Sequence, residues 1–263
     1  MAWLVGLLAA LMLAVAVRAQ EPSTGGPAWD GTLRRIRVPI LMYHYISEPP
    51  PDADIYRIDL SVPSELFREH LTYLAAEVYH TITLEELYAA LNAGAPLPSK
   101  PVVLTFDDGY EDNYTAAFPL LREFGFLGTF FVMTAGPDSI NPAYMTWAQI
   151  SEMSAAGMQM ESHTRDHPDL RGRDNDFLVY QLLGAQESIA AHTGKTPRMF
   201  AYPAGQYDDA VLALLRSLPV EMAVTTDYGA LHTTDAALEL ARIRMRGTTD
   251  TATLAALLAT GSG

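Results

Sequence analysis

The sequence predicts one α/β domain built on a parallel sheet, and three observations lead to this fold class. At 263 residues, of which 49% are apolar, the chain is long enough for one large domain, and no stretch in its middle has the composition of a linker. From about residue 36, short apolar runs alternate with segments of helical periodicity, which is typical of repeated βα units. Such units form either a closed barrel or an open doubly wound sheet, and both alternatives remain open at this point.

Seven apolar runs are predicted to be strands. In chain order they cover 38–44, 79–84, 101–108, 128–133, 158–163, 198–203 and 222–226. Segments with helical spacing follow most of them, at 63–77, 84–94, 114–125, 146–157, 176–194 and 208–218. Glycine readily adopts the left-handed conformation that ends a helix. We therefore expect four of these helices to stop at Gly94, Gly125, Gly157 and Gly194.

The N-terminus has the pattern of an export signal. Residues 2–17 are uncharged and mostly apolar, and small residues stand at the expected cleavage positions after them. An uncleaved anchor is the alternative, because no Lys or Arg precedes the apolar run. We expect a signal peptide or anchor over 1–19, a flexible tether over 20–35 and a folded domain over 36–260, in a protein that is secreted or held in the cell envelope.

The charge balance and the absence of cysteine limit the partners of this protein. A net charge of -14 without a cluster of Lys and Arg argues against nucleic acid, whereas a neutral or cationic substrate fits better. The chain has no cysteine, which excludes disulfides, a thiolate zinc site and an acylated cysteine anchor. Membrane contact is therefore expected only through an uncleaved N-terminal segment.

Polar and ionisable residues gather where the predicted strands end. In closed barrels and open sheets of parallel strands alike, the chemistry collects at the carboxyl ends of the strands. The residues that the predicted strands bring to this edge are His44, Asp107, Asp108, His163, His167 and the turn 202–205.

His163 and His167 follow one predicted strand, in a segment that Pro168 keeps irregular, so that their two imidazoles can bind one metal ion. This spacing alone is a modest signal. With one carboxylate of the Asp107–Asp108 pair it makes the open three-ligand set of a catalytic divalent site. Zinc is the default expectation, although cobalt, nickel and iron accept the same ligands. The unligated aspartate would be free to take a proton from an attacking water.

Three stretches of the sequence resemble motifs of a known family. TFDDGY (105–110), SHTRDHP (162–168) and FAYPAG (200–205) are similar, in this order, to motifs of the polysaccharide deacetylases, the NodB-homology domain of carbohydrate esterase family 4. The resemblance extends from about Arg37 to about Thr249. It implies a distorted (β/α)7 barrel and a metal-dependent hydrolase that removes N-acetyl or O-acetyl groups from sugars of a cell-wall or extracellular polysaccharide.

Carried over residue by residue, the resemblance assigns roles to the first two motifs. It implies that Asp107 is the general base. It also implies that one divalent metal ion is held by Asp108, His163 and His167. The backbone N–H of Tyr110 would donate to the oxyanion of the tetrahedral intermediate.

The third motif and several aromatic residues are expected on the substrate side of the site. Tyr202, Pro203 and Gly205 are the residues of the third motif that the resemblance places there. Aromatic residues in or near loops that follow strands are further candidates for sugar contacts, namely Tyr110, Tyr114, Tyr144, Trp147, Tyr202 and Tyr207.

One position departs from the family pattern. Many members carry an arginine two residues before the proline of the third motif, where it pairs with the catalytic base, but this chain has Ala201 there. If the stretch 240–247 is a strand, its arginines 242, 244 and 246 share one face. We expect Arg242 to replace the missing partner of Asp107. The alternative is a solvated arginine stripe.

The general acid has no clear motif. His232 is one candidate, and His44 in the first predicted strand is the preferred one. VPILMYHYI (38–46) resembles the first strand of a subset of these deacetylases, including those that act on extracellular poly-N-acetylglucosamine. His44 would then face the site, either as the acid or as a partner of an aspartate. Alternatively, His44 is a core histidine hydrogen-bonded to a neighbouring loop.

The expected partner of the protein is an acetylated glycan, and the preferred function is its deacetylation. The alternative is a catalytically weakened carbohydrate-binding relative on the same barrel. An inactive relative would be expected to lack the arginine at position 201 and the motif of the general acid, as this chain does. A metal-dependent phosphoesterase is disfavoured, since the sequence shows neither a second ligand set nor a glycine-rich phosphate cradle.

Overall fold

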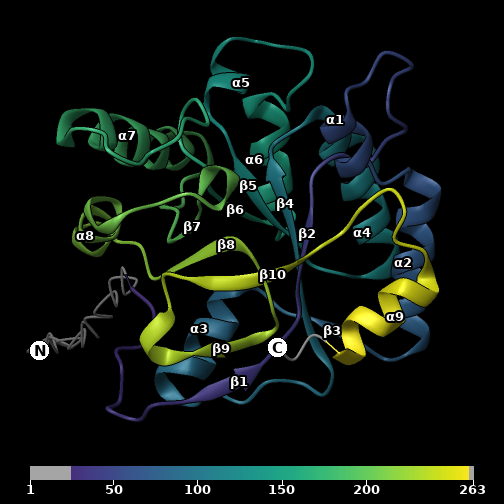
Figure 1. Cartoon of the computed structure of the whole chain (residues 1–263), viewed down its shortest axis with the longest axis horizontal. Coiled ribbons are helices and arrows are strands. Elements are labelled where there is room, and N and C mark those ends of the chain that lie inside the picture. The colour runs from purple at the N-terminus through teal and green to yellow at the C-terminus, as the bar shows by residue number, and fades with distance from the viewer. Residues whose placement is uncertain (1–24, 261–263) are drawn as a thin grey trace, which may run out of the picture.

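The apolar runs of the sequence close into a ring of parallel strands surrounded by helices (Figure 1). The computed structural model describes residues 25–260. Its ring follows the order β2-β10-β8-β7-β6-β5-β4, and β4 pairs back onto β2. The barrel strands are β2 (Ile40–Tyr43), β4 (Pro101–Asp108), β5 (Thr129–Val132), β6 (Gln159–Ser162), β7 (Met199–Ala201), β8 (Met222–Tyr228) and β10 (Leu240–Arg244). The predicted (β/α)7 barrel is confirmed, and the open doubly wound sheet is excluded.

Three short strands lie outside the ring. β3 (His80–Thr81) pairs with the first two residues of β4, ahead of the point where β4 meets β2. β1 (Arg35–Arg37) and β9 (Leu231–Thr233) form an antiparallel ribbon, which the sequence pattern did not predict.

The six predicted helices are present. They are α2 (Ser64–Ala76), α3 (Leu84–Ala93), α4 (Phe118–Phe124), α6 (Trp147–Ala155), α7 (Asn175–Thr193) and α8 (Asp209–Ser217). Gly94, Gly125 and Gly194 are C-caps with left-handed backbone, as predicted, whereas Gly157 lies one residue beyond the C-cap of α6. Further turns of helix are α1 (Ile55–Leu60), η1 (Asn113–Ala117), α5 (Ala135–Asp138), η2 (Pro203–Gly205), η3 (Thr234–Ala236) and α9 (Thr251–Thr260).

The strands read as nearly continuous apolar runs because both of their faces are buried. One face fills the barrel interior with a cluster that includes Ile40, Val103, Phe131, Met199 and Val224. The other face packs under the helices, in a cluster that includes Leu41, Leu104, Phe106, Phe130 and Ile243. This two-layered core holds the carboxyl ends of the strands at one rim, where the predicted site residues lie.

The N-terminal predictions fall largely outside the described part of the chain. Residues 1–24 are not described, so the signal peptide or anchor over 1–19 and the start of the tether stay predictions. Across residues 25–260 there is no helix with the length and apolar character needed to cross a membrane.

Candidate active site and metal centre

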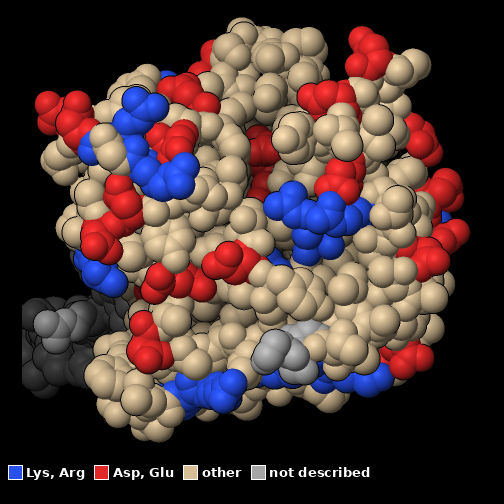
Figure 2. All heavy atoms as spheres, in the orientation of Figure 1, with Lys and Arg blue, Asp and Glu red and all other residues tan. Residues whose placement is uncertain are grey.

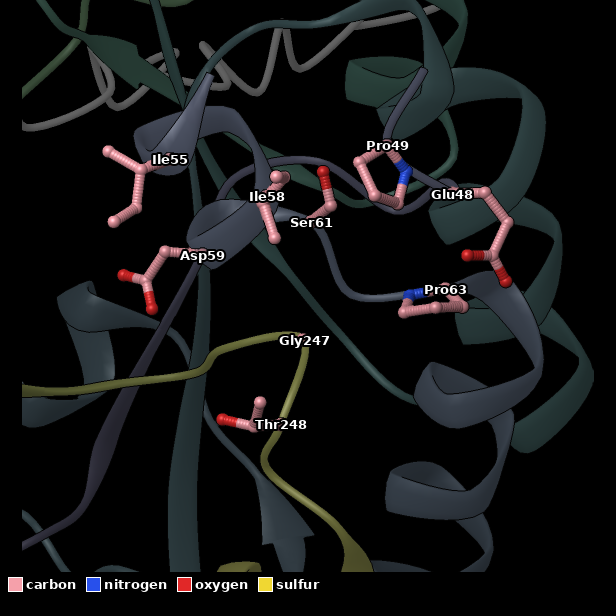
Figure 3. Close-up of a pocket in the computed structure, with 9 residues that line it drawn as sticks. All are labelled: Glu48, Pro49, Ile55, Ile58, Asp59, Ser61, Pro63, Gly247 and Thr248. Carbon is pink, nitrogen blue, oxygen red and sulfur yellow. The ribbon is translucent and has the colours of Figure 1, made fainter. Parts of the chain in front are cut away.

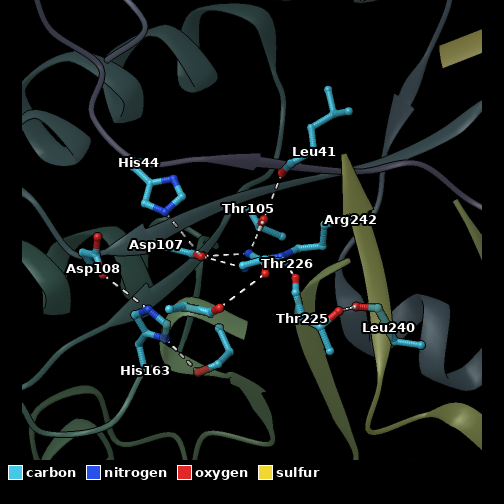
Figure 4. A network of polar contacts seen from close by, with 12 residues as sticks. Leu41, His44, Thr105, Asp107, Asp108, His163, Thr225, Thr226, Leu240 and Arg242 are labelled. Carbon is cyan, nitrogen blue, oxygen red and sulfur yellow. Dashed lines mark hydrogen bonds and ion pairs between the residues drawn. The ribbon is translucent and has the colours of Figure 1, made fainter. Parts of the chain in front are cut away.

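Strand β4 carries the two adjacent aspartates to the rim of the barrel, where Figure 4 shows Asp108 directed toward His163 and Asp107 toward Arg242. The two side chains diverge because Asp107 and Asp108 are successive residues at the end of β4, and successive residues of a strand point to opposite faces. Asp108 has φ 74 and Gly109 has φ 78, so the chain turns sharply there. A left-handed conformation at a residue other than glycine costs about 1–2 kcal/mol. Such local strain is typical of functional sites.

Asp108, His163 and His167 form a compact candidate ligand set. Their candidate ligand atoms all lie within 4.8 Å of one another. Asp108 Oδ1 is 3.3 Å from His163 Nε2 and 3.6 Å from His167 Nε2. His163 donates from Nδ1 to the carbonyl oxygen of Ala201 at 2.7 Å, which orients the ring so that Nε2 is directed at Asp108. Two imidazoles and one carboxylate suit a divalent transition metal.

The electrostatics of the triad are those of a cation site. Burial would raise the pKa of Asp108, but the hydrogen bond and charge of His163 outweigh it and hold this pKa well below its usual range. Burial would lower the pKa of His163, but Asp108 and Asp107 raise it above the ordinary value. The pKa of His167 is lowered by burial and by the neighbouring His163. The carboxylate is therefore an anion that positive charge stabilises.

The loop that carries His167 is fixed by a residue that the sequence analysis missed. Gln181 on α7 is buried, and its Oε1 accepts the backbone N–H groups of Arg165 and Asp166, each at 3.1 Å. Its Nε2 donates to Asp166 Oδ2 at 2.9 Å. The sequence signal for this role was a polar residue at a position that shares the buried face of α7. The buried residues of that helix are Leu178, Gln181, Leu182, Ala185, Gln186 and Ile189.

Asp107 lies within the barrel mouth and is paired with Arg242, as the sequence predicted. Arg242 donates from Nη1 to Oδ1 and from Nη2 to Oδ2, both at 2.7 Å, and the two residues are 1% and 2% exposed. Its other hydrogen bonds, to Thr225 O at 2.8 Å and to Thr105 Oγ1 at 3.1 Å, hold the guanidinium in place. Burial would raise the pKa of Asp107, but Arg242 outweighs it, so this pKa lies below its usual value.

His44 follows β2 and lies beside the same carboxylate. Its Nε2 is 4.0 Å from Asp107 Oδ2, and its buried Nδ1 has no hydrogen-bond partner in the described part of the chain. Burial lowers its pKa although Asp107 and Asp108 act to raise it, so His44 is neutral in the resting site. This arrangement does not match the alternative of a core histidine bonded to a loop.

His232 is not part of this constellation. It lies on β9, and its Nε2 contacts Val38 O at 2.9 Å, just ahead of the first residue of β2 and therefore at the amino end of the barrel. The candidate role of His232 as general acid is wrong, because Asp107 lies at the carboxyl end.

Tyr110 stands in an aromatic stack next to the triad. Its ring centroid is 3.6 Å from that of Tyr45 and 5.3 Å from that of Tyr144. The backbone bridge between Tyr110 and Tyr144 is made by hydrogen bonds from Glu111 N to Ala143 O and from Met145 N to Gly109 O. Neither bond uses the Tyr110 N–H, the group predicted to donate to the oxyanion.

The residues of the third motif are packed inside the protein, where they hold the site in place, and they do not face the substrate. The Tyr202 side chain is fully buried and donates its hydroxyl to Leu238 O at 2.9 Å, and Pro203 is also buried. Their predicted substrate contacts are therefore wrong. Gly205 has φ 71, and a Cβ there would lie 2.3 Å from Thr226 Oγ1, so glycine is needed for packing. This tight turn follows Ala201, whose carbonyl orients His163.

A separate pocket of about 340 Å³ lies between α1 and residues 247–248 (Figure 3). Ile55 and Ile58 of α1 border it on one side and Gly247 and Thr248 on the other. None of the triad residues lines this pocket.

Comparison with known proteins decides the family. The polysaccharide deacetylase family model matches residues 94–223. YxkH of Bacillus subtilis, provisionally named as a polysaccharide deacetylase, is 30% identical over 230 residues, which cover 88% of this chain and 79% of YxkH. The chain belongs to the polysaccharide deacetylase family.

Other family members extend this result. The poly-β-1,6-N-acetyl-D-glucosamine N-deacetylase of Escherichia coli is 32% identical over 211 residues, and the match spans 65% of this chain but only 31% of that enzyme. The solved structure of the Streptococcus pyogenes deacetylase PplD in complex with acetate has a TM-score of 0.79 and 29% identity, covering 86% of this chain and 99% of that one. This polysaccharide deacetylase has the NodB-homology barrel of carbohydrate esterase family 4 and is an amide hydrolase.

Proposed function

We propose that this polysaccharide deacetylase is a metal-dependent enzyme that removes N-acetyl groups, and by the same chemistry O-acetyl groups, from the sugars of a cell-wall or extracellular polysaccharide. The observation that carries the proposal is that the two aspartates at the end of β4 have different neighbours. Asp108 faces two histidines, whereas Asp107 faces Arg242 and His44. One site thus offers a ligand set and a separate, ionised base.

Asp108, His163 and His167 would hold the metal. The donor set fits a divalent transition ion, because His163 is held with Nε2 directed at Asp108 and the carboxylate is stabilised as an anion. Zinc is the proposed ion, with cobalt, nickel and iron as candidates that accept the same ligands. When bound, the cation would supply Lewis-acid polarisation of the acetyl carbonyl and acidify the attacking water.

The protein's own groups would carry the proton transfers. Asp107, ionised because Arg242 lowers its pKa, accepts a proton from the water that attacks the acetyl carbon. The Tyr110 N–H donates to the oxygen that becomes negative in the tetrahedral intermediate. His44, 4.0 Å from Asp107, accepts from that aspartate the proton taken from water and passes it to the departing amine, which returns Asp107 to its ionised form. The low pKa of His44 makes its protonated form a good donor.

The alternative of a weakened carbohydrate-binding relative rested on two departures from the family pattern. Arg242 supplies from β10 the guanidinium that Ala201 lacks, and it contacts Asp107 through two hydrogen bonds. His44 stands where an acid is needed. Both features support an active enzyme.

The substrate and location follow from relatives and remain part of the proposal. The match to an enzyme named for poly-β-1,6-N-acetyl-D-glucosamine supports an N-acetylated amino sugar. A match of 32% identity over 132 residues to the peptidoglycan-N-acetylmuramic acid deacetylase PdaA of Bacillus subtilis supports the same chemical class. Because such polymers lie outside the cytoplasm, we propose a secreted or cell-envelope protein, with residues 1–19 as its signal or anchor.

Acetate release tests the proposal. The protein would be incubated with N-acetylglucosamine oligomers and with peptidoglycan fragments, as purified, after chelation, and after return of Zn²⁺ or Co²⁺. Release that stops on chelation and resumes with the metal supports the proposal. A metal-loaded protein that releases no acetate from any acetylated glycan supports the binding relative instead.

A further inference from the structure

Arg244 lies one step nearer the rim than Arg242, on the same face of β10. Alternate residues of a strand share a face, and Arg242 points into the barrel mouth toward Asp107. β10 pairs with β2 so that Arg244 stands opposite Met42, two residues before His44. The Arg244 guanidinium therefore belongs to the wall of the catalytic site.

Arg244 is the arginine of this wall that has no counterion. Across the described residues it makes no side-chain hydrogen bond or ion pair, although it is partly buried. The two nearest arginines along the chain each form an ion pair, Arg242 with Asp107 and Arg246 with Asp59. Arg57 on α1 donates to Ser47 at 3.0 Å and stacks on Tyr45. Burying a charged group without a counterion costs free energy, and a ligand of opposite charge would remove this cost for Arg244.

The charged groups around Arg244 leave it positive. The acidic ones that face it are Asp107 and Asp59, and each is already paired with another arginine. His44 is neutral, while Arg242 and Arg246 add positive charge, and together with burial they lower the pKa of Arg244. Figure 2 shows basic side chains gathered beside the hollow in which acidic ones are visible. On a chain of net charge -14, this is a local site for an anion.

We propose that Arg244 binds a carboxylate of the substrate, so that the polysaccharide carries an acidic sugar at or next to the unit that loses its acetyl group. A guanidinium offers two parallel N–H groups that match the two oxygens of a carboxylate. The overall negative charge of the protein does not prevent this, since charges beyond about 8 Å are screened at physiological salt. The inference rests on the proposed function and narrows its substrate class.

Two disaccharides that differ in a carboxylate test the inference. One is N-acetylglucosamine linked to N-acetylmuramic acid, which bears a lactyl carboxylate, and the other is the neutral di-N-acetylchitobiose. Acetate release would be measured for the wild type and for Arg244→Gln, Arg244→Lys and the control Arg246→Gln. A hydrogen-bonded charge pair corresponds to about 10- to 100-fold in affinity.

We expect Arg244→Gln to lower kcat/KM about 10- to 100-fold on the acidic disaccharide, mainly through KM, and less than about 3-fold on the neutral one. Arg244→Lys should recover part of the loss, and Arg246→Gln should leave the ratio of the two substrates unchanged. An equal effect of Arg244→Gln on both disaccharides, or no effect on either, would overturn the inference and leave the deacetylase intact. If the metal-loaded wild type releases acetate from neither disaccharide nor from any longer acetylated glycan, the proposed function fails and the inference fails with it.

Discussion

Arg242 and Asp107 meet inside the barrel with both of their N···O contacts at 2.7 Å, although they come from β10 and β4, which are separated in the ring by β2. The pair therefore bridges the strands on either side of β2, the strand that His44 follows. It explains how this deacetylase keeps a guanidinium on the proposed base, Asp107, although position 201 holds alanine.

Loss of this guanidinium should affect both activity and stability. In Arg242→Met, Asp107 stays buried without its partner, so its pKa rises. We expect the acid limb of the kcat/KM profile to move to higher pH. Breaking a buried pair costs about 3–5 kcal/mol, which urea denaturation would detect.

The double variant Asp107→Asn with Arg242→Met is the control for this prediction. It removes both buried charges, so we expect it to recover part of the unfolding free energy without recovering acetate release. An Arg242→Met variant with the wild-type pH profile would show that Arg242 does not tune Asp107.

Gln181 should act on metal affinity without touching the metal. Gln181→Leu removes all three hydrogen bonds to the loop that carries His167. Loss of such supporting contacts typically weakens metal binding 10- to 100-fold. Gln181→Glu keeps an acceptor for Arg165 N and Asp166 N, so we expect it to bind metal more tightly than Gln181→Leu. Titration with Co²⁺, followed by absorbance, measures this directly, and equal affinity of Gln181→Leu and wild type would refute the role.

Glu161 should make the protein less stable as the pH rises from about 4.5 to about 8. Burial raises its pKa to about 8, although its carboxylate accepts hydrogen bonds from Met199 N and Arg198 N. A folded pKa above the unfolded one means that the folded state binds more protons, so stability falls through this window and is level above it. The loss is on the order of a few kcal/mol.

The measurement is urea denaturation at pH 5 and at pH 8 for the wild type and Glu161→Gln. Since the glutamine side chain does not ionise, the wild type should lose more free energy of unfolding between these pH values than the variant does. Parallel losses in both proteins would assign the pH dependence to other groups.

The strands and helices of the barrel could be predicted from local patterns, whereas the closure of the barrel and the choice of Asp108 as a candidate metal ligand came from the resemblance to a known family. Strand β4 was predicted with its observed bounds, since a continuous apolar run ending in two aspartates has few other readings. The pairing of Arg242 with Asp107 could be predicted only from two facts together. Position 201 holds alanine where many family members have arginine, and an arginine-rich stretch follows later in the chain.

Other features depend on contacts that no local pattern specifies. Tyr202 was predicted to face substrate, but tertiary packing against Tyr207 and a bond to Leu238 O bury it. The role of Gln181 depends on how α7 lies against a loop that follows β6. No local pattern specifies the left-handed backbone of Asp108 at the end of β4.

The division of labour between Asp107 and Asp108 is tested most directly by Asp107→Asn. Metal content by elemental analysis and acetate release from N-acetylglucosamine oligomers would be measured on the same preparation, beside wild type and Asp108→Asn. We predict that Asp107→Asn retains the wild-type metal content but loses at least about 100-fold in kcat, whereas Asp108→Asn loses the metal. Acetate release by Asp107→Asn at the wild-type rate, or metal loss on that substitution alone, would contradict the account.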